Sequence, residues 1–272
     1  MLYNAKEFTI DTGTARTDCV SFGSGPDALV MIQGLNLRPV KGSGLPLAIA
    51  YKAFAKDYKV YVFDRRDPLP EKVTVKDLSD DIAQNMKSLG IEKADIFGVS
   101  QGGMIAQYLA LDHPELVRSM VLGVTLCRSN PTVESVIGGW VGLAEKNDYK
   151  ALVDDLMVKM YSDEYINRYA RLFSIVQKTQ KFVPAERFIK LAQSCTSCDT
   201  YDRLTEIKCP VLVLGGMKDK IVTPQASEEI AEKLGCEIYM YPGLGHSAYE
   251  EAKDFNARVL EFFRKHKNPP CA

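Results

Sequence analysis

The chain has 272 residues, of which 46% are hydrophobic, and its formal net charge at pH 7 is −1. This composition is typical of a globular protein with a large core, and the lack of any basic run argues against a nucleic-acid partner. The sequence has no apolar stretch near the roughly 18 residues of a membrane span and no signal-peptide core at its start, so we expect a cytoplasmic protein without a membrane partner.

Apolar runs alternate with helical patterns along most of the chain. Residues 6–10 and 17–23 predict an antiparallel hairpin at the edge of a sheet. Short, nearly continuous apolar runs are typical of strands buried on both faces, and they lie at residues 28–32, 58–64, 93–99, 119–124 and 210–216. Because helical segments separate these runs, we predict an α/β protein with a doubly wound, mostly parallel sheet.

Two of the predicted helices have clear boundary signals. The first carries an apolar stripe that consists of Val75, Leu78, Ile82, Met86 and Leu89. We expect Thr74 to cap the start of this helix and Gly90 to end it. In the second helix, we expect Thr223 to be the cap, Pro224 to take the first position and Gly235 to end the helix.

Residues 128–200 interrupt the alternation, because they have helical patterns but no convincing strand. We therefore predict a helical insertion at 128–200, within an α/β core made of residues 1–127 and 201–272. Four aromatic residues of the insertion recur every fourth position and predict one helix face: Tyr161, Tyr165, Tyr169 and Phe173. We interpret this face as the insertion's own packing core, with pocket lining as the alternative.

The segment GVSQGG, residues 98–103, joins a predicted strand to a predicted helix. A serine at this junction lies at the carboxyl edge of the sheet, where α/β folds bind ligands. The turn is sharp, so side chains in place of Gly98 and Gly102 would collide with the neighbouring strand and helix. The start of the helix is the positive end of its dipole, and the backbone N–H of Gln101 can point at an oxyanion. The pattern predicts that Ser100 is a nucleophile and not a linker serine.

A serine nucleophile needs a base, and the chain has only three histidines. His113 lies at the far end of the helix that follows Ser100, and His266 lies in the C-terminal tail. His246 follows a predicted strand at 236–241, so it lies at the same edge of the sheet as Ser100. If Ser100 is catalytic, His246 is its base.

The acid that orients the histidine should follow another strand at the same edge. Asp219 does so, since it comes directly after the strand predicted at 210–216. The chain order Ser, Asp, His is the order of α/β hydrolases. Ser100, Asp219 and His246 are therefore the predicted catalytic triad.

The sequence resembles an α/β-hydrolase-fold serine hydrolase with a helical cap, similar to the group of 3-oxoadipate enol-lactonases, carboxylesterases and proline iminopeptidases. The likeness spans nearly the full length, with GVSQGGMIAQYLALDHPELVRSMVL at the serine, KCPVLVLGGMKDKIVTP at the acid and YPGLGHSAYEE at the histidine. It implies that Ser100 is the nucleophile, Asp219 the acid and His246 the base, with the insertion as a cap over the pocket.

The sequence departs from this family in two places. The family's oxyanion loop usually has His-Gly, and here Gln33 stands in the place of the histidine. The resemblance implies that the backbone N–H of Leu35 is the second oxyanion donor, beside that of Gln101. After the next strand the family tends to have Asp-x-Arg-Gly, and this chain keeps Asp64 and Arg66 but lacks the glycine. We interpret both residues as structural.

These features predict a serine hydrolase that cleaves a small carboxylic ester or lactone through an acyl-enzyme, with a small-molecule substrate and no metal or organic cofactor. The same triad also serves aminopeptidases, thioesterases and C–C hydrolases, and a slow-turnover, receptor-like binding protein is a further alternative. We expect Trp140, Met157 and Tyr161 of the insertion to line the pocket. Nothing in the sequence decides the oligomeric state, and a homodimer stays open.

The chain has seven cysteines, of which only Cys195 and Cys198 form a close pair in the sequence. A zinc site would need a second pair or nearby histidines, and neither is present. We interpret Cys195 and Cys198 as thiols that pack between helices, with a redox pair as the alternative.

Overall fold

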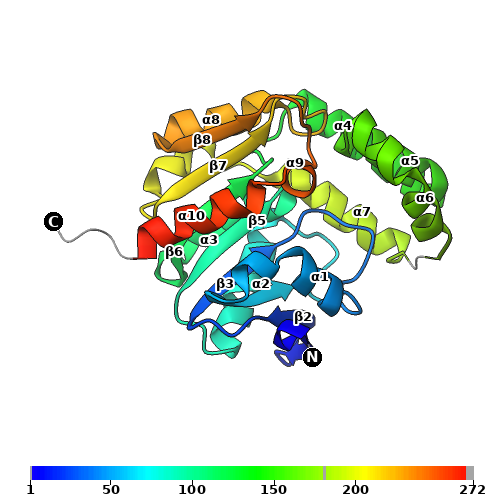
Figure 1. The fold of residues 1–272 in the computed structure, drawn as a ribbon. Helices are drawn as coiled ribbons and strands as arrows, with labels where there is room; N and C mark the ends of the chain where they lie inside the picture. The colour runs from blue at the N-terminus through cyan, green and yellow to red at the C-terminus, as the bar shows by residue number, and fades with distance from the viewer. Residues whose placement is uncertain (1, 180–181, 268–272) are drawn as a thin grey trace.

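The protein is described by a computed structural model that covers residues 2–179 and 182–267, with the backbone alone for residues 2 and 172–179. Eight strands form one sheet in the order β1-β2-β4-β3-β5-β6-β7-β8 (Figure 1). They are β1 (Lys6–Asp11), β2 (Arg16–Phe22), β3 (Asp27–Ile32), β4 (Tyr58–Phe63), β5 (Ala94–Val99), β6 (Val117–Gly123), β7 (Val211–Gly216) and β8 (Glu237–Tyr241). The pairs β1–β2 and β2–β4 are antiparallel and all the others are parallel, which confirms the predicted fold class and the edge hairpin.

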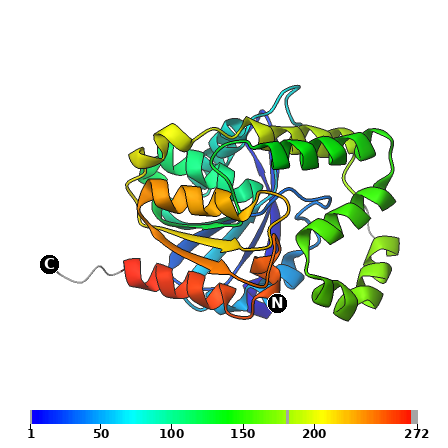
Figure 2. The same ribbon diagram turned by 90° about the horizontal axis from the view of Figure 1, so that it is seen from above.

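Ten α-helices occur in the described residues. They are α1 (Gly44–Ala50), α2 (Val75–Ser88), α3 (Gln101–Asp112), α4 (Pro131–Glu145), α5 (Tyr149–Met160), α6 (Asp163–Thr179), α7 (Ala185–Ser194), α8 (Pro224–Leu234), α9 (Ala248–Glu251) and α10 (Phe255–Lys267). Helices α2, α3 and α8 cover one face of the sheet, and α1 and α10 cover the other (Figures 1 and 2). None of the described helices is long and apolar enough to cross a membrane.

The two faces of the sheet bury two separate apolar cores. Val30 and Ile32 of β3 point into the core below α2, α3 and α8, whereas Leu29 and Met31 of the same strand point into the core below α1 and α10. This alternation is the period of two that a strand imposes on its side chains. It explains why the strands have continuous apolar runs, since both of their faces are covered.

The helix boundaries follow the predicted signals with one exception. Thr74 and Asp77 form a reciprocal capping box at the start of α2, and Gly235 ends α8 in the left-handed conformation with φ 61°. Thr223 precedes α8, but its side chain makes no capping hydrogen bond. Its φ is 75°, outside the extended conformation from which a cap side chain reaches the first free amides, so the predicted side-chain cap is wrong.

Helices α4 to α7 lie between β6 and β7 in the sequence, where we predicted the insertion. They stand beside one end of the sheet and not on either face (Figures 1 and 2), and α4 packs against both α5 and α7. The division of the chain into a core and a cap domain stays a prediction.

The prediction that Tyr161 shares one helix face with Tyr165 and Tyr169 is wrong. Helix α5 ends at Met160, so Tyr161 lies in the turn before α6 and not on the same helix as Tyr165 and Tyr169. The rings of Tyr161 and Tyr165 stack, and that of Tyr169 packs on Tyr165 at a tilt, at a partly exposed surface where Tyr169 keeps 36% exposure. They do not form the insertion's core, and the side chain of Phe173 lies outside the described residues.

The turn between β5 and α3 is where the sheet and its helix approach each other most closely. A Cβ atom on Gly98 would lie 2.4 Å from the carbonyl oxygen of Gly102 in α3. A Cβ atom on Gly102 would lie 1.9 Å from the carbonyl oxygen of Ile32 at the end of β3. Both contacts are with backbone, which cannot rotate away, so glycine is required at both positions as the sequence predicts.

Replacement of Gly102 by alanine should destabilise the protein, since the added methyl group overlaps the β3 backbone. We expect Gly102→Ala to lower the free energy of unfolding by at least about 1–3 kcal/mol. Gly138→Ala is the matched control, because a Cβ there meets nothing within 4 Å on exposed α4. It should raise stability by roughly 0.5–1 kcal/mol. Thermal or urea unfolding measures both, and equal effects of the two substitutions would contradict the packing argument.

Candidate active site

Ser100 lies on the turn between β5 and α3 in a strained backbone conformation, with φ 53° and ψ −124°. Two hydrogen bonds hold this conformation in place. The Ser100 N–H donates to the Gly123 carbonyl of β6 at 2.9 Å, and the Thr125 hydroxyl donates to the Ser100 carbonyl at 2.7 Å. A non-glycine residue in such a conformation is typical of functional sites in which the surrounding structure fixes the strain.

The structure brings Ser100, His246 and Asp219 together from three separate loops. The Ser100 Oγ lies 2.9 Å from His246 Nε2, and His246 Nδ1 lies 2.8 Å from Asp219 Oδ2. Asp219 Oδ1 accepts from the N–H groups of Ile221 and Val222 at 2.8 and 3.0 Å. A carboxylate oxygen accepts, so Nδ1 carries the proton and Nε2 is free to accept from the Ser100 hydroxyl.

This chain of hydrogen bonds is shielded from solvent. The exposed fractions of His246 and Asp219 are 3% and 6%. Both residues follow strands, Asp219 after β7 and His246 after β8, at the carboxyl edge where β5 delivers Ser100. Burial in this position limits competition from water and strengthens the electrostatic contacts between the three groups.

The other two histidines have different partners. His113 Nε2 lies 3.0 Å from Asp80 Oδ1 in the connection between α3 and β6. His266 lies within α10, which continues to Lys267, and its ring packs against Phe262. Neither ring contacts Ser100, so both histidines lie away from the predicted nucleophile as the sequence indicates.

The two backbone amides expected to form an oxyanion hole lie beside Ser100. Leu35 lines the same cavity as Ser100, and Gln101 is the first residue of α3. Within the described part of the chain, neither N–H has a protein acceptor. Gly34 allows the loop to approach, because a Cβ on it would lie 3.1 Å from the Ser100 Cβ. Both amides are available to a ligand oxygen.

A small, largely apolar cavity of about 30 Å³ adjoins Ser100 and His246. Its wall on the insertion side consists of Val133, Ile137, Trp140, Leu156, Met160 and Cys195. The structure places Trp140 in this wall, but Met157 and Tyr161 lie outside it.

The positions of these two residues follow from the geometry of α5. Leu152, Leu156 and Met160 recur every fourth residue and face the core, which turns Met157 away by about one residue's 100° step. Tyr161 lies past the end of the helix, and its hydroxyl donates to Glu250 at 2.5 Å. The four-residue spacing in α5 was the signal that could have identified Leu156 and Met160.

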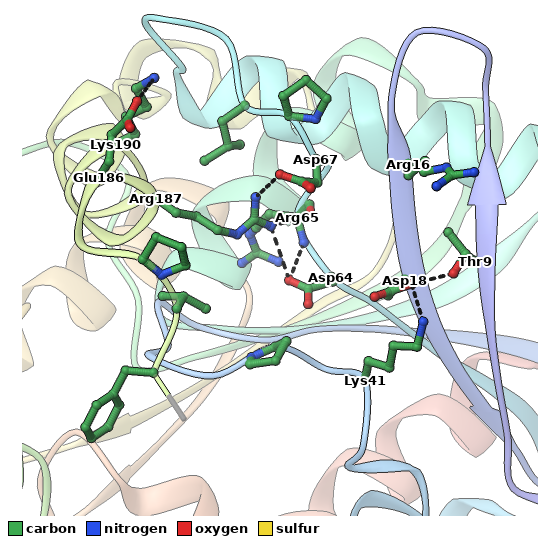
Figure 3. A pocket seen from close by; sticks show the side chains of 16 residues that line it. Thr9, Arg16, Asp18, Lys41, Asp64, Arg65, Asp67, Glu186, Arg187 and Lys190 are labelled. Carbon is green, nitrogen blue, oxygen red and sulfur yellow. Dashed lines mark hydrogen bonds and ion pairs between the residues drawn. The ribbon is translucent and has the colours of Figure 1, made fainter. Parts of the chain in front are cut away.

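A second, much larger cavity of about 680 Å³ lies apart from the triad (Figure 3). It opens between the β1–β2 hairpin, the loop after β4 and α7. Several of its cations pair with carboxylates: Arg187 lies 3.4 Å from Asp67, and Lys41 lies 3.8 Å from Asp18. Figure 3 shows none of the triad side chains among its lining residues, so we assign no reaction to it.

The described cysteines are all free thiols. Cys195 and Cys198 are both buried, and burial raises the pKa of the Cys195 thiol to about 11. Such thiols are protonated and unreactive at neutral pH, which supports their interpretation as packing residues. No three His, Cys, Asp or Glu side chains in the described ranges gather closely enough to hold a metal ion.

Comparison with known proteins places this architecture in one family. A model of the alpha/beta hydrolase fold family matches residues 27–253. Among the relatives, the "Putative carbamate hydrolase RutD" of Rhizobium rhizogenes is 25% identical over 88% of this chain and 94% of its own length. The "3-oxoadipate enol-lactonase 1" of Acinetobacter baylyi is 23% identical over 78% of this chain and 81% of its own length.

Solved structures have the same fold. The α/β hydrolase MGS-M2, from a deep-sea metagenome library, matches with a TM-score of 0.84 at 22% identity over 95% of this chain and 97% of its own. The enol-lactonase of Burkholderia xenovorans matches with a TM-score of 0.83 at 20% identity over 94% of this chain and 100% of its own. With the family match over most of its length, this chain belongs to the α/β-hydrolase-fold family and is a hydrolase.

Proposed function

We propose that the protein is a serine hydrolase that cleaves a small carboxylic ester or lactone through an acyl-enzyme. The observation that carries the proposal is the continuous, buried hydrogen-bond chain from Ser100 through His246 to Asp219. The adjacent amides of Leu35 and Gln101 add donors for a carbonyl oxygen. Nucleophile, base, orienting acid and oxyanion donors are the parts that acyl transfer needs.

The geometry supports the following reaction. His246 Nε2 takes the proton of the Ser100 hydroxyl as its oxygen attacks the substrate carbonyl, and the Leu35 and Gln101 amides donate to the developing oxyanion. The C–O bond of the ester breaks as the His246 imidazolium gives its proton to the leaving oxygen. Water, deprotonated by His246, then attacks the acyl-enzyme and releases the acid and a protonated Ser100. In a lactone the leaving alcohol stays joined to the acyl group.

The apolar cavity and the named relatives support the proposed substrate class. Carbamates and enol lactones both have a carbonyl carbon with an oxygen substituent, the group that this arrangement would attack. The cavity of about 30 Å³ is far below the roughly 300–1,000 Å³ of most ligand sites. We infer that helices α4 and α5 act as a cap that must shift when substrate enters, and that short acyl or lactone groups are preferred.

Ser100→Ala should abolish hydrolysis across a panel of p-nitrophenyl esters, lactones, carbamates and thioesters, because no other hydroxyl in the site is paired with the base. It should also abolish covalent labelling of the protein by a fluorophosphonate. Mass spectrometry of the labelled protein locates the adduct. Labelling that survives in Ser100→Ala would show a different nucleophile, and a wild type that turns over no member of the panel would favour a binding protein.

His246→Ala should lower kcat by about 10⁴-fold or more and leave the fold intact, by analogy with other serine triads. His113→Ala is the matched control, since that ring contacts Asp80 and not Ser100. Steady-state kinetics and circular dichroism on both variants measure the difference. A loss below tenfold in His246→Ala, with a greater loss in His113→Ala, would identify the wrong histidine as base.

Leu156→Ala should shift the acyl-length optimum of kcat/KM to longer chains, because it removes apolar bulk from the cavity wall. Each buried methylene contributes about 0.8 kcal/mol, so one added carbon is measurable. Met157→Ala is the control on the same helix, one residue beyond Leu156 and outside the wall. If kinetics across acyl lengths gave both variants the wild-type profile, the insertion would not select the substrate.

A further inference from the structure

Arg65 is a buried arginine in the lining of the large charged cavity, and its hydrogen-bond partner Gln101 directly follows Ser100. It follows β4 and keeps only 7% exposure. Figure 3 shows it in the floor of the charged cavity, beside Asp64 and Arg187. Burial lowers the pKa of Arg65 to about 10, so the guanidinium remains charged at neutral pH. None of the steps of the proposed reaction uses the buried charge of Arg65.

The guanidinium of Arg65 contacts both segments that contain the proposed oxyanion donors. Its Nη2 donates to the Gln33 carbonyl at 2.6 Å, two residues before Leu35. Its Nη2 and Nε donate to the side-chain oxygen of Gln101 at 3.0 and 3.3 Å. One side chain therefore ties the loop after β3 to the start of α3. Hydrogen bonds from a charged donor are stronger than neutral ones, which suits this bridge.

The other half of the Gln101 side chain binds the insertion. Its Nε2 donates to the Leu191 carbonyl of α7 at 2.7 Å and to the Ser194 hydroxyl at 3.1 Å. In return, Arg187 of α7 donates to the carbonyl of Arg65 at 2.6 Å. Helix α7 thus binds the backbone carbonyl of Arg65, and it also binds Gln101, the side-chain partner of Arg65.

We propose that Arg65 is a positioning residue that fixes the two oxyanion donors relative to each other, and that α7 holds Arg65 and Gln101 in place. The proposal rests on the proposed function. Arg65 does not touch substrate. Its bond to the Gln33 carbonyl fixes the peptide before Gly34, a residue whose freedom would otherwise let the Leu35 amide turn away. Its bond to Gln101 fixes the first turn of α3. Preorganised donors matter because they need no rearrangement as the charge develops.

The chain offers a matched pair of variants. Arg65→Met removes the bridge and keeps the aliphatic bulk, whereas Arg66→Met alters the next residue, whose guanidinium pairs with Asp81 at 3.3 Å. Displacement of one donor by about 1 Å costs on the order of 10²-fold in rate. We expect Arg65→Met to lower kcat about 10- to 100-fold with little change in KM. Arg65→Lys, with one charged donor group, should recover part of the loss, and Arg66→Met should keep the wild-type kcat.

The decisive measurement is inhibition by a small trifluoromethyl ketone, whose adduct with a serine places an oxyanion in the hole. Its Ki should rise in Arg65→Met by the same factor as kcat falls, and should not change in Arg66→Met. If Arg65→Met does not fold, Gln101→Met tests the same bridge, since it removes the side-chain acceptor and keeps the backbone donor.

The outcomes separate the two proposals. A folded Arg65→Met or Gln101→Met with kcat and Ki within about threefold of wild type overturns the positioning role alone. A loss in stability with unchanged Ki does the same. A wild type that has no Ser100-dependent hydrolysis on any substrate overturns the proposed function, and the role of Arg65 with it.

Discussion

The close contact between the end of β3 and the start of α3 fixes the backbone around the candidate site. Gly102 lies against the Ile32 carbonyl so tightly that no side chain fits, and this contact fixes the helix axis over the sheet. With the helix start fixed, the chain can join β5 to α3 only through a strained residue, which is Ser100. Strain of this kind costs about 1–3 kcal/mol, and the bonds from Thr125 and to Gly123 help to offset it. The position of the Ser100 side chain is therefore a consequence of how α3 packs on the sheet.

The insertion is attached to the core next to the proposed base. The N–H of Ser247, the residue after His246, donates to the Met160 carbonyl at the end of α5 at 2.9 Å. Ser162 binds Glu251 through both its N–H and its hydroxyl, and Tyr161 binds Glu250. On the other side of the cavity, α7 binds Gln101 and the backbone of Arg65. Under the proposed function, these contacts at both ends of the insertion would link substrate entry to the positions of Ser100, His246 and Gln101.

The sequence was sufficient to predict the sheet, the turn between β5 and α3, and the chain order of Ser100, Asp219 and His246. Buried parallel strands and a glycine-flanked turn follow local rules of periodicity and sterics, and these are visible in the residues themselves. The failures have a different origin. Thr223 takes a backbone conformation that tertiary contacts impose, and the turn at Tyr161 ends a helix although the aromatic spacing continues through it. The four-residue spacing of Leu152, Leu156 and Met160 marks the inner face of α5, but which of these residues reach the cavity also depends on how α4 and α5 pack.

Cavity size alone would favour the large charged cavity over the cavity at Ser100. The 680 Å³ cavity is large and rich in charge, yet its arginines and lysines face carboxylates and backbone carbonyls within the protein. The cavity at Ser100 has about 30 Å³, but it holds unpaired amides, a nucleophile with a base and apolar walls. Groups without a protein partner are those that a substrate can use, because a paired group must first give up an existing bond. Arg65 lines the large cavity, but its guanidinium donates to Gln33 and Gln101 on the two segments next to the smaller one. Under the proposed role of Arg65, the large cavity bears on the reaction through this one lining residue, so an alteration of Arg65 would affect the donors beside Ser100.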